Sequence, residues 1–226
     1  MKVAAEFYPY TFGQSVAGAD YLAAGYEPRM EIDPLDITNI ATREKQTKDS
    51  FEKLRAGDPS AAILVDLVKE EDMMAAFSEP GVWVVADSMP CLATGEEPLT
   101  WDSPYGYGSA HPRAAGSHAK VLRFQREGGN ITLMEAVAKL SYYQAEWLGP
   151  MVPDLQERGR IQQGMIADVT IYDPETVTDK SSCESGKSSF SSTGNPYVIV
   201  NGTIVVDDSE VLKVFPGQAI RNDITE

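Results

Sequence analysis

The chain has 226 residues, of which 42% are hydrophobic, and a formal net charge of −15. This composition is typical of a globular protein with room for one large domain or two small ones. The negative charge argues against nucleic-acid binding, which needs a basic surface. No stretch is long and apolar enough to span a bilayer, and the first ten residues lack the basic start and apolar core of a secretory signal.

The two cysteines, Cys91 and Cys183, are far apart in the sequence and form no CxxC pair. A disulfide framework and a thiolate zinc site are therefore not expected. Two separate thiols are typical of a reducing compartment, so we expect a cytoplasmic protein. Cys91 follows Asp87 by four residues, which leaves open whether it lies beside a pocket or only in a loop.

The first part of the chain predicts short strands and helices. Residues 1–10 predict a strand, and residues 43–56 predict a helix. An apolar run at 61–65, a short helix at 69–77 and a second apolar run at 82–86 follow. A strand, a helix and a strand within about 25 residues form the pattern of a βαβ unit, which builds parallel sheets.

The second apolar run ends in Asp87. A carboxylate at the carboxyl end of a buried parallel strand is where barrel enzymes place their catalytic groups. An ordinary turn or capping role is the alternative interpretation. The segment 88–112 that follows is rich in Pro, Gly, Ser and Tyr. Long loops are usually functional or disordered, and its aromatic residues favour an ordered lid or pocket wall.

Two helices are predicted next, at 114–127 and 132–147. The second has its apolar residues on one face and begins at a capping-box pattern, in which Thr132 and Glu135 each satisfy a backbone N–H group. From residue 159 onward the pattern changes to short strands.

Within this β-rich part, Asn201-Gly202 lies between two β-branched runs and predicts a type I′ hairpin. The Ser-rich segment 179–194 predicts a mobile loop.

Five motifs occur in a characteristic order. They are Tyr8-Pro9-Tyr10-Thr11, Ala86-Asp87-Ser88, His111-Pro112-Arg113, Gly159-Arg160-Ile161-x-x-Gly164-x-x-Ala167-Asp168 and Val200-Asn201-Gly202. In this order they resemble the C-terminal half of N-acyl-D-amino-acid deacylases, the D-aminoacylase branch of the amidohydrolase superfamily. The first three motifs are fairly specific to the branch, whereas many amidohydrolases share the last two. The resemblance covers nearly the whole chain.

The resemblance implies an α/β fold in two portions. Residues 1–158 would be the C-terminal part of a metal-dependent-hydrolase (β/α)₈ barrel, and residues 159–226 would be the C-terminal strands of a small β-sandwich. Residues 1–10, about 61–67 and 82–86 would then be the last strands of the barrel.

The resemblance also implies roles for four residues. Asp87 matches the catalytic aspartate, which takes a proton from metal-bound water and later delivers one to the leaving amine. Arg113 and Tyr10 match residues that bind the substrate carboxylate, to which a guanidinium offers a two-point fork. A surface ion pair for Arg113 and a core position for Tyr10 are the competing interpretations. His111 joins the substrate-binding candidates, with a structural role as the competing interpretation.

Most metal ligands of the family are missing from this chain. Asp87 is only a weak candidate ligand, and the two histidines, His111 and His118, form no ligand pair. A catalytic zinc site needs about three protein ligands, and His118 is expected on a helix surface. We therefore expect the chain to be a fragment. Zinc or another divalent metal would be bound in the complete enzyme, and this chain alone would hold none.

The expected partner is the missing N-terminal barrel half, or a second copy of the chain, because two or three parallel strands cannot close a barrel. The expected function is hydrolysis of the amide bond of a small N-acyl-D-amino acid by metal-activated water, without nucleic-acid or membrane partners. The alternative is a catalytically inert truncated remnant, or a subunit that completes a barrel with another polypeptide. A dihydroorotase-like or hydantoinase-like enzyme fits the tail motifs equally well but fits the first and third motifs poorly.

Overall fold

The computed structural model describes residues 3–88 and 90–221, and the chain divides into two compact units. One unit combines Met1–Pro9 with Ala75–Glu226, and the other is Tyr10–Met74. Residues 1–2, 89 and 222–226 belong to the predicted barrel and sandwich portions but lie outside the described residues. The predicted boundary after residue 158 falls within the first unit, and the assignment of the two portions stays a prediction.

The Tyr10–Met74 unit contains a three-stranded antiparallel sheet in the order β2–β4–β3. Its core gathers side chains from the sheet and the helices around Ile37, Phe51 and Ile63. The elements are β2 (Phe12–Val16), η1 (Asp20–Leu22), α1 (Tyr26–Met30), η2 (Pro34–Asp36), β3 (Ile37–Asn39), α2 (Lys48–Gly57) and β4 (Ala62–Asp66). The helix predicted at 43–56 is confirmed as α2, which begins later because Thr47 caps it by accepting the Ser50 N–H.

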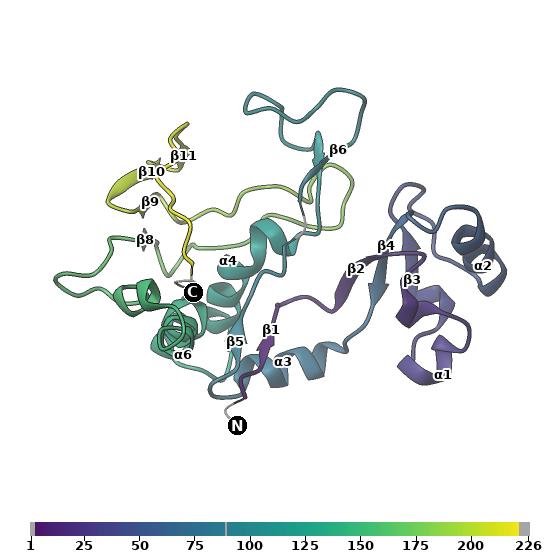
Figure 1. Cartoon of the computed structure of the whole chain (residues 1–226), viewed down its shortest axis with the longest axis horizontal. Coiled ribbons are helices and arrows are strands. Elements are labelled where there is room, and N and C mark those ends of the chain that lie inside the picture. The colour runs from purple at the N-terminus through teal and green to yellow at the C-terminus, as the bar shows by residue number, and fades with distance from the viewer. Residues whose placement is uncertain (1–2, 89, 222–226) are drawn as a thin grey trace, which may run out of the picture. The chain divides into compact units, whose positions relative to one another are not determined.

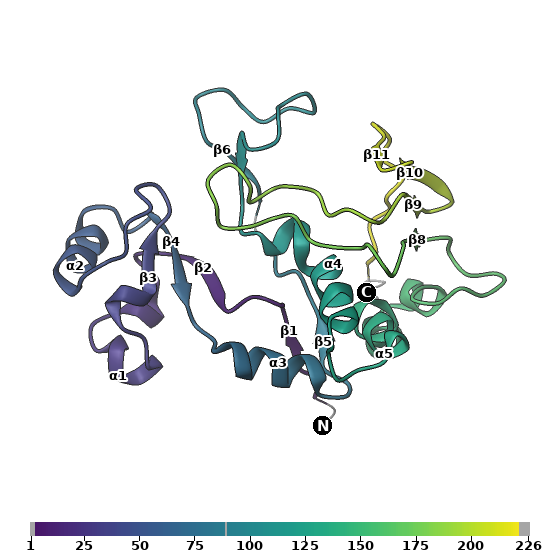
Figure 2. The same ribbon diagram turned by 180° about the vertical axis from the view of Figure 1, so that it is seen from behind.

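The predicted βαβ unit at 61–86 is wrong in its strand pairing. Its three elements exist as β4, α3 (Glu70–Ser78) and β5 (Trp83–Val84). However, β4 pairs antiparallel with β2 and β3, whereas β5 pairs parallel with β1 (Glu6–Phe7). Figures 1 and 2 show β1 and β5 side by side. An apolar run predicts a buried strand but does not identify its partner, so 61–67 does not share a sheet with 82–86.

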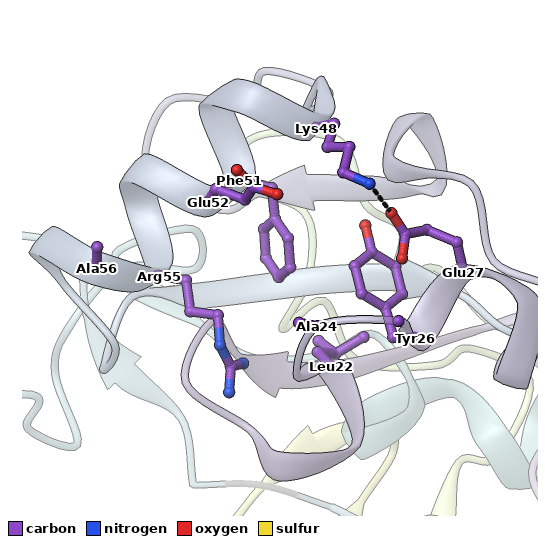
Figure 3. A pocket seen from close by; sticks show the side chains of 10 residues that line it. Leu22, Ala24, Tyr26, Glu27, Lys48, Phe51, Glu52, Arg55 and Ala56 are labelled. Carbon is purple, nitrogen blue, oxygen red and sulfur yellow. Dashed lines mark ion pairs between the residues drawn. The ribbon is translucent and has the colours of Figure 1, made fainter.

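A pocket of about 420 Å³ lies in the Tyr10–Met74 unit between α1 and α2. Figure 3 shows Tyr26 beside Phe51, with the Lys48–Glu27 ion pair close to the tyrosine hydroxyl. The Tyr26 hydroxyl is buried and has no hydrogen-bond partner among the described residues. Burial, followed by the charge of Glu27, raises the pKa of Tyr26 to about 12.

We expect Tyr26→Phe to stabilise the protein by about 1 kcal/mol at pH 7, because it removes a buried hydroxyl that makes no hydrogen bond. The unfolded tyrosine ionises near its usual pKa of about 10, and folded Tyr26 ionises at about 12. Between these pH values the unfolded state therefore binds fewer protons than the native state, and the native protein loses stability as pH rises from 10 to 12.

Tyr26→Phe should remove part of this loss of stability at alkaline pH. Urea unfolding followed by circular dichroism measures both effects, with Tyr21→Phe, at an exposed tyrosine of the same unit, as the control at pH 7. A clear loss of stability at pH 7 in Tyr26→Phe would show that the hydroxyl has a partner.

In the other unit, helices pack against β5 and fix its position. The predicted helix at 114–127 is confirmed as α4 (Arg113–Arg126), and the one at 132–147 as a continuous run of α5 (Leu133–Val137), the π-helical turn η3 (Ala138–Tyr142) and α6 (Tyr143–Leu148). Lys139 is fully buried, and its ammonium donates to the carbonyl oxygens of Glu79 and Val82, the latter at 3.0 Å. Gln144 Nε2 donates to the Val84 carbonyl at 2.9 Å. These bonds hold β5, which ends three residues before Asp87.

The predicted capping box is confirmed in part: the Thr132 hydroxyl accepts the Glu135 N–H at 3.1 Å, but α5 has no reciprocal bond from the Thr132 N–H to the Glu135 carboxylate. The Glu135 carboxylate accepts a hydrogen bond from the Tyr143 hydroxyl at 2.7 Å and lies 3.8 Å from the Lys139 ammonium. Burial lowers the pKa of Lys139, and the carboxylate of Glu135 opposes this effect. These polar contacts thus offset the free-energy cost of burying the Lys139 ammonium.

The β-rich C-terminal part contains a four-stranded antiparallel sheet in the order β11–β10–β9–β8. The remaining elements of this unit are β6 (Leu92–Ala93), β7 (Gly108–Ser109), η4 (Pro153–Glu157), β8 (Val169–Ile171), β9 (Tyr197–Val200), β10 (Thr203–Asp207) and β11 (Glu210–Val211). The type I′ hairpin is confirmed, since Asn201 and Gly202 both have positive φ and Val200 pairs with Thr203. In these four strands every described residue is at least partly exposed.

None of the helices in the described part of the chain combines the length and apolar character needed to cross a membrane.

Candidate active site

Asp87 lies just past the end of β5, as the sequence predicts for a strand-end carboxylate. The Val85 N–H donates to the Phe7 carbonyl at 2.9 Å, so the parallel pairing continues almost to the aspartate. Asp87 has a φ of +45°, which is an uncommon conformation for a residue with a side chain. Such strained positions concentrate at functional sites. The side chain is 60% exposed and is therefore open to a reactant.

Arg113, the first residue of α4, holds the Asp87 carboxylate. Its Nη2 lies 2.9 Å from Oδ2 of Asp87, and the arginine side chain is only 4% exposed. Its guanidinium carbon lies 4.4 Å from the centre of the Tyr8 ring, within the range of a cation–π interaction. The Nε atom is buried without a hydrogen-bond partner among the described residues. The guanidinium thus has an ionic partner, an aromatic partner and an Nε–H without a hydrogen-bond partner among the described residues.

His111 is buried and supports the start of α4. Its Nδ1 accepts the backbone N–H of Arg113 at 3.0 Å, so this nitrogen is the unprotonated one. The imidazole also meets the Tyr8 ring edge to face, with ring centres 6.0 Å apart. These contacts orient the backbone of Arg113, whereas the predicted substrate contact of His111 stays a prediction.

The structure brings Asp87, Arg113 and His111 together and adds Tyr8, which is not among the predicted site residues. Tyr8 and Tyr10 belong to one motif and alternate with Pro9, so the sequence alone could not separate their roles. Tyr10 is buried at the start of the other unit and contacts Phe12. Its role in substrate binding stays a prediction.

His118, which the sequence places on a helix surface, is exposed on α4, as expected.

The donor atoms at this site do not fit a metal ion. In the described part of the chain no group of three or more His, Cys, Asp or Glu side chains is placed to hold one. Asp87 offers one carboxylate, which already faces a guanidinium, and Nδ1 of His111 is used by a backbone amide. A catalytic zinc ion needs about three protein ligands. The described site offers an exposed carboxylate, held by a buried guanidinium whose Nε–H has no hydrogen-bond partner among the described residues.

An exposed carboxylate at the end of a parallel strand, paired with a buried arginine, defines a candidate site for acid–base chemistry in an α/β protein. No family model matches the chain. It is 34% identical over 134 residues to the N-acyl-D-glutamate deacylase of Alcaligenes xylosoxydans xylosoxydans, covering 59% of this chain and 25% of that protein. It is 31% identical over 163 residues to the N-acyl-D-aspartate deacylase of the same organism, covering 72% and 28% respectively.

Among solved structures, the N-acyl-D-glutamate deacylase of Bordetella bronchiseptica, in complex with zinc and a phosphonate inhibitor, matches with a TM-score of 0.66. The match has 26% identity and covers 90% of this chain and 40% of that one. The homologues of this chain are therefore N-acyl-D-amino-acid deacylases, matched over part of their length. The chain spans between a quarter and about a third of the curated relatives.

Proposed function

We propose that this chain supplies the proton-transferring and carboxylate-binding part of an enzyme that hydrolyses the amide bond of N-acyl-D-amino acids. The observation that carries the proposal is the 2.9 Å pair between exposed Asp87 and buried Arg113 at the end of a parallel strand. The homology to deacylases of N-acyl-D-glutamate and N-acyl-D-aspartate supports it.

In this proposal the two side chains act in sequence on one substrate. The Arg113 guanidinium binds the substrate carboxylate with donors that Asp87 does not use, including the buried Nε. Binding of the substrate carboxylate by Arg113 positions the scissile amide bond beside the Asp87 carboxylate. Asp87 accepts a proton from the attacking water and then delivers it to the leaving nitrogen, so the products are a carboxylic acid and a free amino acid. Tyr10 and His111 are the further substrate-binding candidates.

We propose that the divalent metal is bound by a polypeptide portion outside these 226 residues. In the B. bronchiseptica structure this metal is zinc. Two features of the described chain support a need for further polypeptide. The parallel sheet has only β1 and β5 among the described strands, and the strands of the β8–β11 sheet carry no fully buried residue. We propose that the added portion completes a (β/α)₈ barrel and the small β-sandwich. A cytoplasmic location belongs to the same proposal, since both cysteines lie outside any disulfide in the described chain.

The experiment measures metal content and hydrolysis of N-acetyl-D-amino acids, beginning with D-glutamate and D-aspartate and including the L-enantiomers. It is run on the 226-residue chain alone and together with the polypeptide encoded upstream of it. We expect neither bound zinc nor turnover from the chain alone, and both from the combination. Turnover by the chain alone would contradict the need for a second portion. Bound zinc without hydrolysis of any substrate in the panel would contradict the deacylase assignment.

The second candidate function is a non-catalytic one, favoured by the lack of a three-ligand metal group in the described residues. In this alternative the chain persists as an inert remnant or as a subunit that completes a barrel without catalysing a reaction. Formation of a stable complex with the upstream polypeptide, without hydrolysis, would favour the subunit. No complex and no hydrolysis would favour the remnant.

A further inference from the structure

The serine strap is defined here as residues 181–192, within the Ser-rich segment 179–194 for which the sequence predicts a mobile loop. In the structure it packs against the protein, and its mobility stays a prediction. It contains no helix or strand, yet Ser181 and Ser188 are only 6% and 7% exposed. Figures 1 and 2 show it as part of the yellow-green chain that runs beside the start of α4. Burial of a hydroxyl is costly unless it forms a hydrogen bond, so the partners of these serines indicate what the strap holds.

Four serine hydroxyls of the strap bond to the backbone of residues 108–115, which leads into α4 and forms its first turn. The bonds are Ser189 Oγ to the Gly108 carbonyl at 3.2 Å, the Ala110 N–H to Ser188 Oγ at 3.2 Å, Ser181 Oγ to the Pro112 carbonyl at 2.8 Å, and Ser192 Oγ to the Ala115 carbonyl at 2.9 Å. Each bond joins segments about 70–80 residues apart in the sequence. The strap therefore follows the His111-Pro112-Arg113 motif along its backbone.

The start of α4 has no ordinary side-chain cap, so its first turn is held by contacts from outside the helix. Its N-cap residue is Pro112, which makes no side-chain capping bond. A helix start normally takes one from Ser, Thr, Asp or Asn at this position. Here His111 takes the place of the cap by accepting the Arg113 N–H. Ser181 does not cap the helix; it donates to the Pro112 carbonyl, which also accepts the Gly116 N–H at 3.0 Å, and so holds the first turn from outside.

The strap is held at its flanks by α4 and by a close backbone contact. Arg123 on α4 binds Asp179 at 2.8 Å, and Arg126 Nη1 donates to the Val177 carbonyl at 2.7 Å. On the other side Gly194 has a φ of +85°, and a Cβ there would lie 2.5 Å from the Cα of Val177. Only glycine fits this approach. The first flank of the strap is thus bound to the last turns of α4, and the second flank is packed on the first.

We propose that the serine strap sets the position of the Arg113 guanidinium for binding of the substrate carboxylate, with Ser181 as the positioning residue. This inference rests on the proposed deacylase function. Ser181 does not reach the guanidinium, and it acts through the Pro112 carbonyl and the first turn of α4. An arginine that must meet both Asp87 and a substrate carboxylate needs its backbone held in place, because small displacements weaken two-point binding.

The first test uses the 226-residue chain and does not require activity. The backbone amides of Ala115 and Gly116, which donate to the Pro112 carbonyl, and the Arg113 Nε–H resonance are followed by NMR. Ser181→Ala should speed exchange of the two amides about tenfold and shift the Arg113 Nε–H resonance. Ser192→Ala should change the Ala115 and Gly116 exchange in the same direction. Ser185→Ala, at an exposed serine of the strap, is the matched control and should change none of these signals. Unchanged amides and an unchanged Arg113 resonance in Ser181→Ala would overturn the proposal.

The second test uses the chain combined with its upstream polypeptide. Ser181→Ala should raise KM for an N-acetyl-D-amino acid about tenfold with kcat within about twofold, and Ser181→Thr should restore most of the affinity. The KM for the matching N-acetyl amine, which lacks the carboxylate, should not change. A fall in kcat with unchanged KM would overturn the positioning role. If the wild-type combination hydrolyses no substrate, the proposed function fails, and the NMR result on the chain still decides whether the strap positions Arg113.

Discussion

Asp87→Asn should abolish deacylation by the chain combined with its upstream polypeptide, lowering kcat by about a thousandfold or more, while metal content stays near normal. Loss of a positioned general acid and base typically costs between about a hundredfold and ten-thousandfold in rate. An asparagine side chain has nearly the same shape as aspartate and tolerates a positive φ such as the +45° of Asp87, so the fold should be retained. The amide neither accepts nor releases the proton that the reaction needs.

Asp208→Asn is the matched control for this change. Asp208 also has a positive φ, of 46°, but it is exposed in the turn between β10 and β11. Rates for both variants are measured with saturating N-acetyl-D-glutamate, and metal is measured by atomic spectroscopy. The control should keep full activity. Full activity in Asp87→Asn would remove Asp87 from the mechanism, whereas equal losses in both variants would point to a folding effect.

Arg113→Ala should raise KM for carboxylate-bearing substrates, because the substrate carboxylate loses a desolvated guanidinium. The expected loss of binding free energy is about 2–5 kcal/mol. The arginine side chain is almost fully buried, so few water molecules can replace it. Arg113→Lys should recover part of the affinity, since lysine keeps the charge but not the fork. Steady-state kinetics on an N-acetyl-D-amino acid and on the matching N-acetyl amine separate the carboxylate contribution.

The same kinetics distinguish two roles for Arg113. A carboxylate-binding arginine affects KM only for the substrate that carries a carboxylate. An arginine that mainly orients Asp87, to which it is bound at 2.9 Å, would lower kcat for both substrates. Arg160→Ala is the control, because Arg160 also stacks on a tyrosine, Tyr142, but is exposed. An unchanged KM in Arg113→Ala would count against carboxylate binding.

Local sequence patterns predicted those parts of the structure that depend on residues close in the chain. The helices at 114–127 and 132–147 follow from apolar spacing, and Thr132 caps the second one as predicted. The hairpin at Asn201-Gly202 follows from the need for two residues with positive φ. The same holds for Asp87, because the apolar run before it predicts a strand and the motif places a carboxylate at the strand end.

The pairing of strands and the partners of polar groups were decided by tertiary structure. The run at 61–65 has the same apolar character whether β4 pairs antiparallel with β2 or parallel with β5. The sequence likewise carries no signal that the ring over Arg113 is that of Tyr8, because Tyr8 and Tyr10 belong to one short motif. The role of Tyr10 in substrate binding stays a prediction.

The sequence by itself determined the positions of the main helices, the strand that leads to Asp87, and the family to which the homologues belong. Each of these depends on residue order over short distances, where periodicity and capping chemistry act. Only the tertiary structure showed that Arg113 meets Asp87 and Tyr8, that β4 belongs to a separate antiparallel sheet, and that the Ser-rich segment packs along the start of α4. These contacts join residues from about 26 to about 105 positions apart, and a serine or arginine carries no local signal for a partner that distant.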